Sequence, residues 1–130
     1  MNEDVASAFF DEYIETFYRC EAGAEDLRAM LSFYFVPFSF SSTQGFTFLA
    51  DEAAVLAFVG QMVERLRAAG FATAETIHRE FVELNSVSSH CIYSFLRRRL
   101  DGSELERMTV TYLLAETNAG VRIITFAADI

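Results

Sequence analysis

The chain has 130 residues and a formal net charge of −9 at pH 7. This length suggests one domain over residues 1–130, and the 52% of hydrophobic residues can build a sizeable core or a lined cavity. The acidic balance argues against nucleic acid or an anionic membrane as a main partner, because both require a positively charged surface.

Cys20 and Cys91 are the two cysteines of the chain. The acidic N-terminus, Met-Asn-Glu-Asp, lacks the basic and then apolar order of a signal peptide. No apolar run approaches the roughly 18–20 residues that are needed to cross a bilayer. We therefore expect a cytoplasmic protein with two free thiols, and a disulfide between them is the alternative.

The first part of the sequence predicts two helices and a strand. Residues 4–19 predict a helix with Asp4 as its N-cap and an apolar stripe at helical spacing. A second, short helix is expected over residues 24–31, where acidic residues in the first turn suit the helix dipole. Residues 33–40 predict a strand with two apolar faces, and Pro37 places it at an edge or a bulge. The stripe of the first helix consists of Ala6, Phe10, Tyr13, Ile14 and Phe17.

The clearest helix follows a turn at residues 41–45 and a short strand at residues 46–49. This helix is expected over residues 51–69, with Asp51 as its N-cap and Gly70 as its stop signal. A strand over residues 73–84 comes next.

The dipeptide Asp101-Gly102 is the strongest hairpin signal, because both central residues of a type I′ turn need a positive φ. With this two-residue loop, Arg99 pairs with Glu104 and Arg97 pairs with Glu106. Further from the tip, the same face pairs apolar residues across the two strands, which stabilises a hairpin. A last strand is expected over residues 121–127. The apolar pairs are Phe95 with Met108, Tyr93 with Val110, and Cys91 with Tyr112.

This order of elements predicts an α+β fold with helices on one face of a curved sheet. In the same order, and in five short segments, the chain resembles the nuclear transport factor 2-like superfamily, which includes ketosteroid isomerase, scytalone dehydratase and polyketide-cyclase-like proteins. The segments are residues 33–37 with Gly45, residues 64–70, residues 99–102, residues 111–114 and residues 120–123.

The resemblance implies a cystatin-like cone, in which a curved antiparallel sheet wraps around the N-terminal helices. It also implies a pocket inside the cone and, commonly, a homodimer. The resemblance does not imply a particular activity, because proteins of one fold have many functions. The pocket Asp that ketosteroid isomerase and scytalone dehydratase use has no match here in Asp51, Asp101 or Asp129.

His78 and Glu80 are the candidate catalytic pair. They alternate with Ile77 and Arg79 on the strand over residues 73–84, and we expect His78 and Glu80 to point into the cone. A histidine there suits general acid or base chemistry, and a desolvated carboxylate can act as a base. The alternative is that both are ordinary polar residues of a strand.

Aromatic residues are the candidate ligand-binding set, since tyrosine hydroxyls can orient a ligand between apolar walls. No close-paired metal-ligand motif is present, and no Gly-rich phosphate loop indicates a nucleotide cofactor. We therefore expect no metal and no cofactor. The candidate ligand-binding residues are Tyr13, Phe17, Phe35, Tyr93, Tyr112 and Thr125.

Three functional hypotheses follow. The leading one is a protein that binds a small hydrophobic molecule in an apolar, cone-shaped pocket and forms a homodimer through its sheet face. The first alternative is an enzyme of the isomerase, dehydratase or cyclase type that transfers protons through His78 and Glu80. The second is a non-catalytic dimeric interaction module whose sheet face, including Ile92 and Thr111, contacts a second protein.

Overall fold

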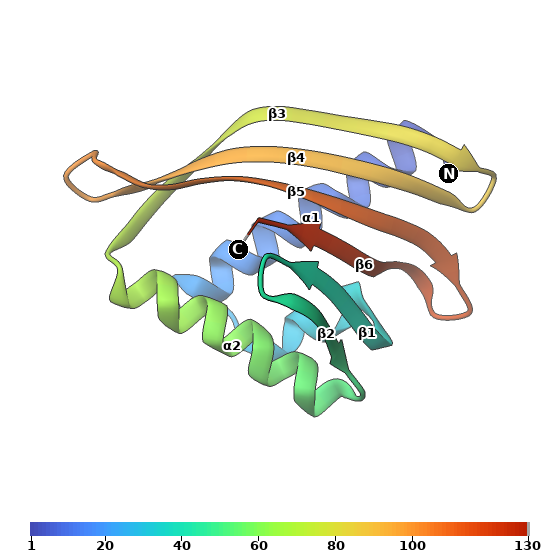
Figure 1. Cartoon of the computed structure of the whole chain (residues 1–130), viewed down its shortest axis with the longest axis horizontal. Coiled ribbons are helices and arrows are strands. Elements are labelled where there is room, and N and C mark those ends of the chain that lie inside the picture. Colours follow the sequence, from blue (N-terminus) through green and yellow to red (C-terminus); the bar gives the residue numbers. More distant parts are fainter. Residues whose placement is uncertain (130) are drawn as a thin grey trace.

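A computed structural model of the protein describes residues 1–129, and within them six strands form one sheet (Figure 1). The strand order is β2-β1-β6-β5-β4-β3. The elements are α1 (Glu3–Glu21), the 3₁₀ helix η1 (Leu27–Phe33), β1 (Tyr34–Ser42), β2 (Gly45–Leu49), α2 (Glu52–Ala68), β3 (Phe71–Asn85), β4 (Ser88–Arg99), β5 (Glu104–Thr117) and β6 (Gly120–Ala128).

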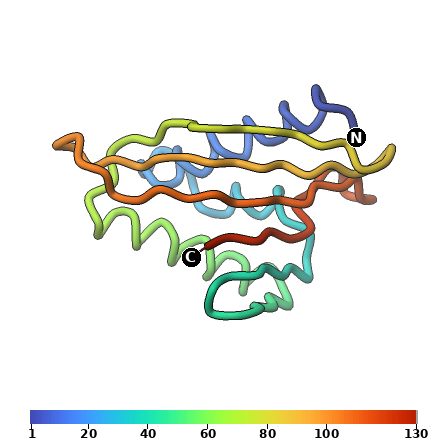
Figure 2. The backbone as a smooth tube through the Cα atoms, turned by 45° about the horizontal axis from the view of Figure 1, so that its top comes forward, coloured from blue at the N-terminus to red at the C-terminus, as the bar shows by residue number. Residues whose placement is uncertain are grey.

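The predicted α+β class is confirmed, and the sheet is mixed rather than wholly antiparallel. β1 pairs with β6 in parallel, and the other neighbouring strands are antiparallel. The long strands β3, β4 and β5 run side by side and curve along their length (Figures 1 and 2). On the inner face of the sheet, α1 packs against β3 and β4, while α2 contacts β1 and β2.

Short polar side chains set where the helices begin. The Asn2 side chain accepts a hydrogen bond from the Val5 amide, so α1 begins before the expected N-cap Asp4. Asp51 caps α2 as predicted, since its carboxylate accepts from the Ala54 amide. The helix expected over residues 24–31 is instead the later 3₁₀ helix η1, because Asp26 caps that segment.

The β4–β5 hairpin has the predicted register in its body and a different loop at its tip. Arg97 pairs with Glu106 as expected, but the register shifts by one residue so that Arg98, not Arg99, pairs with Glu104. The Gly102 amide donates to the Arg99 carbonyl, and Gly102 has a φ of +86°. The loop is therefore a three-residue turn closed by a glycine bulge, and Asp101 does not need a positive φ.

Two further bulges decide which side chains face the helices. In β3 the pairing with β4 shifts between Thr76 and His78, and in the β5–β6 pair it shifts between Leu113 and Leu114. A bulge inserts one unpaired residue, so side chains beyond it change faces relative to strict alternation. Both shifts reorient residues that the sequence had placed inside the cone.

Phe10 of α1 lies at the centre of the aromatic core. Its side chain is fully buried, and its ring contacts four other rings at centroid distances of 5.1–6.1 Å. These neighbours come from α1, β3, β4 and β5, so Phe10 joins the first helix to the three long strands. The four rings belong to Tyr13, Phe81, Tyr93 and Tyr112.

We predict that Phe10→Ala lowers the free energy of unfolding by about 3–5 kcal/mol, because it leaves a cavity that these rings cannot fill. Leu100→Ala is the control: the Leu100 side chain is 92% exposed, and its removal is expected to change stability by at most about 0.5 kcal/mol. Chemical denaturation of both variants measures the difference. Equal losses of stability would contradict the assignment of Phe10 to the core.

Candidate functional site

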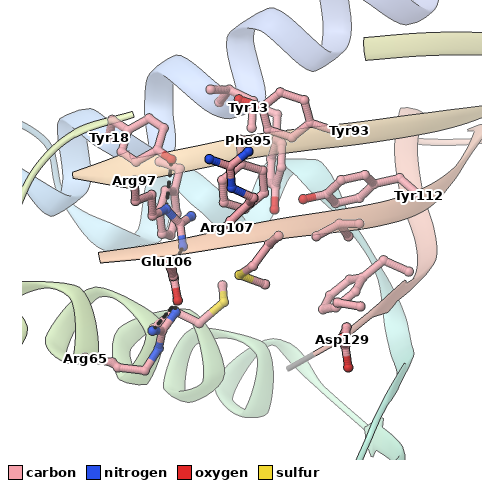
Figure 3. Close-up of a pocket in the computed structure, with 17 residues that line it drawn as sticks. Tyr13, Tyr18, Arg65, Tyr93, Phe95, Arg97, Glu106, Arg107, Tyr112 and Asp129 are labelled. Carbon is pink, nitrogen blue, oxygen red and sulfur yellow. Dashed lines mark hydrogen bonds and ion pairs between the residues drawn. The ribbon is translucent and has the colours of Figure 1, made fainter. Parts of the chain in front are cut away.

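A cavity of about 400 Å³ opens between α1, α2 and the inner face of the sheet (Figure 3). Aromatic and aliphatic side chains form most of its wall, and a set of charged side chains occupies part of it. The residues around it are Tyr13, Ile14, Phe17, Tyr18, Met62, Arg65, Tyr93, Phe95, Arg97, Glu106, Arg107, Met108, Val110, Tyr112, Phe126, Ala128 and Asp129.

Four of the six residues expected to bind a ligand do line this cavity: Tyr13, Phe17, Tyr93 and Tyr112. The other two lie elsewhere. Phe35 is 37% exposed and lies outside the lining, and the Thr125 hydroxyl donates to the Ser39 carbonyl of β1 at 2.7 Å. The bulge in the β5–β6 pair accounts for Thr125, because it places Phe126 rather than Thr125 on the inner face beside Tyr112.

His78 and Glu80 lie on the outer face of the sheet, so the prediction that they point into the cone is wrong. Their side chains are 57% and 52% exposed, and neither lines the cavity. The bulge at residue 77 keeps Thr76 on the inner face but turns His78 and Glu80 outward. The two side chains meet each other at 3.4 Å between Nε2 and Oε2.

Arg79 takes the inward place between them. Its guanidinium carbon lies 5.2 Å from the ring centre of Phe10 and 5.0 Å from that of Phe81. The same guanidinium donates to the Asp11 carboxylate at 2.6 Å and to both oxygens of Ser7. These contacts fasten β3 to α1 outside the cavity, so Arg79 has a structural role.

Tyrosine hydroxyls supply polar points in the apolar wall. The hydroxyls of Tyr13 and Tyr34 share a hydrogen bond of 2.8 Å, and both residues are buried. Burial raises the pKa of Tyr13 and raises the pKa of Tyr34 and Tyr112 well above the usual value. These phenols are therefore neutral at physiological pH, and Tyr13 and Tyr112 can exchange hydrogen bonds with a ligand in the cavity.

A chain of charged contacts forms one side of the cavity (Figure 3). The Arg97 Nε donates to the Tyr18 hydroxyl at 3.1 Å, and its Nη1 donates to Glu106 at 2.5 Å. The same carboxylate accepts two hydrogen bonds from Arg65, at 2.9 and 3.2 Å. We call Tyr18, Arg97, Glu106 and Arg65 the charged wall; its members come from α1, β4, β5 and α2.

Glu106 is held as a carboxylate. Burial opposes its ionisation, but hydrogen bonds from Arg65 and Arg97 and the charges of these arginines outweigh burial and lower the pKa of Glu106. A carboxylate stabilised in this way is a weak base. Cys91 is a weak nucleophile, since burial raises the pKa of its thiol to about 12.

The charged wall and the two methionines of the cavity, Met62 and Met108, were not among the site residues predicted from the sequence. One signal was available, because the expected hairpin register already paired Arg97 with Glu106 on the face that carries Phe95 and Tyr93. The contacts of Arg65 and Tyr18 with this pair could not be predicted from the sequence, since they depend on how two helices pack on the sheet.

Three features of residues 1–129 concern membrane spans, metal ligands and thiols. No helix in this range is long and apolar enough to cross a membrane. In the same range, no group of three or more His, Cys, Asp or Glu side chains is arranged to hold a metal ion. Cys20 and Cys91 are both free and buried.

We predict that Glu106→Gln lowers the free energy of unfolding by about 1.5–3 kcal/mol near neutral pH, because the hydrogen bonds it removes join charged groups. The folded-state pKa of Glu106 is lowered, so its contribution is present above the unfolded-state value of about 4.3 and is lost as the pH falls through the folded-state value. The gap between wild type and variant should therefore shrink in acid.

Denaturation of both proteins across the acidic and neutral range tests this prediction. Glu64→Gln is the control, since Glu64 is 75% exposed and pairs with Arg67 at 3.4 Å; we expect it to change stability by less than about 1 kcal/mol. A stability gap for Glu106→Gln that is independent of pH would contradict the assignment.

Structural comparison finds the same fold in several solved proteins. An NTF2-like protein of unknown function from Shewanella oneidensis MR-1 has a TM-score of 0.72 and 16% identity, with 100% of each chain covered. A domain of unknown function with a cystatin-like fold from Nostoc punctiforme PCC 73102 has a TM-score of 0.69 and 15% identity, covering 99% of this chain and 78% of that chain. These similarities confirm the cystatin-like fold.

A third neighbour, from Catenulispora acidiphila, was solved in complex with S-DNPA and has a TM-score of 0.65 and 10% identity, covering 98% of this chain and 94% of that chain. A sequence comparison with curated proteins found no match. Residues 2–129 match the family described as NTF2-like protein (DUF6841). With nearly the whole chain inside that match, the protein belongs to the DUF6841 family of NTF2-like proteins.

Proposed function

We propose that this protein binds a small, largely apolar molecule in the cavity between α1, α2 and the sheet. The observation that carries the proposal is the cavity itself, about 400 Å³ and walled mainly by aromatic side chains. Sites for small molecules are typically concave and apolar, with a few placed polar groups. Here the hydroxyls of Tyr13 and Tyr112 provide such groups.

The two methionines of the lining suit a binding role. Met62 on α2 and Met108 on β5 are both partly buried and lie at the cavity. Methionine side chains are flexible and polarisable, so they adapt to the shape of a bound ring system. The remaining wall is more rigid, because Tyr13, Tyr93 and Tyr112 are locked by ring contacts with Phe10.

The chemistry of the cavity supports binding more than proton transfer. A general base needs a pKa near the working pH, whereas Glu106 is held as a weakly basic carboxylate and the buried phenols stay protonated. His78 and Glu80 lie on the outer face and do not reach the cavity. The solved neighbour in complex with S-DNPA adds support from the fold.

We predict that the neutral fluorescent probe N-phenyl-1-naphthylamine binds to the wild-type protein and that Ala128→Trp lowers its affinity at least about ten-fold. Ala128 is a small, partly buried residue of the lining, so an indole there fills the space that the probe needs. The matched control is Ala57→Trp, which alters an exposed position of α2 outside the lining.

A fluorescence titration measures both affinities, and circular dichroism checks that both variants are folded. No saturable binding to the wild type would contradict the proposed function. Binding that Ala128→Trp and Ala57→Trp weaken equally would place the probe outside the cavity.

We also propose a homodimer that forms through the outer face of the sheet. In the described part of the chain all helices pack on the opposite face, and large apolar side chains remain exposed on the outer one. Exposed apolar patches of this kind mark protein interfaces. They lie at the two edges of the sheet: Phe46 and Phe48 of β2 are 72% and 63% exposed, and Val82 and Leu84 of β3 are 38% and 45% exposed.

We predict that the wild-type protein has twice the chain mass of 14.7 kDa in solution and that Thr111→Arg yields monomers. Thr111 lies mid-strand in β5 on the outer face, where it pairs with Ile92, so two copies would bring like charges together. Asn118→Arg, at an exposed turn, is the control. Light scattering at micromolar concentration tests the prediction, and a monomeric wild type would contradict the dimer.

A further inference from the structure

We infer that the ligand of this cavity carries an anionic group, such as a carboxylate, a phenolate or a sulfonate, which Arg97 of the charged wall binds together with Arg65. This inference rests on the proposed function, because it names the chemical class of the molecule in the same cavity. Three features of the site point to it: the surroundings of Arg97, the sharing of Glu106 between two arginines, and the balance of charge at the cavity.

Arg97 is a fixed and nearly buried cation. Its side chain is 11% exposed, and its guanidinium carbon lies 4.6 Å from the ring centre of Phe95 and 5.8–5.9 Å from those of Tyr18 and Phe17. Aromatic faces attract a guanidinium and hold it in one orientation. Such a group is already positioned for a ligand, so binding loses little conformational entropy.

The hydrogen-bonding capacity of Arg97 is only partly used within residues 1–129. Nε donates to Tyr18 and Nη1 donates to Glu106, and no described residue accepts from Nη2. No fully buried side-chain nitrogen of the described residues lacks a partner, so Nη2 is not sealed inside the protein. Since Arg97 lines the cavity, this donor is available to a ligand bound there.

Glu106 does not neutralise its surroundings, because two arginines share its single charge. The lining contains three arginines against two acids, Glu106 and Asp129, in a chain whose net charge is −9. The third lining arginine, Arg107, pairs with the exposed Glu104 outside the lining. The excess of positive charge is therefore confined to the charged wall, where Arg65 and Arg97 face the single carboxylate of Glu106.

A neutral ligand and an anionic ligand differ in what they do to Arg97. A neutral apolar ligand removes water from Nη2 and leaves a charged donor without a partner, which is costly. An anionic ligand supplies the missing acceptor through a charge-assisted hydrogen bond. The cavity therefore favours an apolar body with an acidic group at the end that meets the charged wall.

A matched pair of probes tests this inference. 1-Anilinonaphthalene-8-sulfonate has the ring system of N-phenyl-1-naphthylamine with one added sulfonate. We expect the wild type to bind the sulfonate at least about ten-fold more tightly than the neutral probe, and we expect Arg97→Met to remove that preference. Methionine keeps apolar packing against the rings, and Glu106 keeps Arg65 as its partner.

Two further variants keep the test decisive if Arg97→Met is unfolded. Arg65→Met alters a half-exposed side chain and is expected to weaken the sulfonate about three-fold or more, while Glu106→Gln removes the competing carboxylate and is expected to strengthen it by a similar factor. The control is Arg98→Met, which removes one positive charge from the outer face, where Arg98 pairs with Glu75; we expect it to change neither affinity.

The outcomes separate this inference from the proposed function. Equal affinities for the two probes, unchanged by Arg65→Met and Glu106→Gln, would overturn the anionic ligand and leave the apolar cavity intact. A loss of sulfonate affinity in Arg98→Met as large as in Arg97→Met would also overturn it, because net charge alone would explain the preference. Failure of both probes to bind would overturn both proposals.

Discussion

The contact between Arg97 and Glu106 joins the parts of this protein that form its cavity. Through Arg65 it reaches α2, and through Tyr18 it reaches α1, so two strands and two helices meet at one ion pair. Arg97 is 11% exposed and Glu106 is 19% exposed, which means that neither charge is fully solvated. Removing one partner of such a pair leaves the other poorly compensated. The cavity wall therefore depends on a contact that is both structural and chemically suited to a ligand.

The aromatic core fixes the rest of the cavity. Phe10 holds Tyr13, Tyr93 and Tyr112 at ring distances of 5.1–5.7 Å, so these tyrosines have little freedom to collapse inward. Tilted and edge-on ring contacts of this kind add stability beyond simple burial. A rigid aromatic wall from α1, β4 and β5 and flexible methionines on α2 and β5 together explain how a small protein keeps an internal space open.

Much of the fold followed from the sequence, because local signals agreed with one another. Asp51 marked the start of α2 correctly, and the alternation of Arg97, Phe95 and Tyr93 predicted the inner face of β4. The misplaced site residues are Phe35, His78, Glu80 and Thr125, and the last three lie beyond a bulge. A bulge depends on how two strands pair over their whole length, so the alternation within one strand does not reveal it. The helix contacts of Arg97 and Glu106 were hidden for a similar reason, since they depend on tertiary packing.

The protein belongs to a family of NTF2-like proteins. The aromatic rings, methionines and charged side chains of this chain determine the shape and charge of its cavity. The most direct test of a ligand-binding cavity is a crystal structure of the protein soaked with N-phenyl-1-naphthylamine. Our account predicts electron density for the probe between Tyr13, Met62 and Tyr112, with the charged wall at one end. A cavity closed by its own side chains, or a probe bound only on the outer face of the sheet, would contradict it.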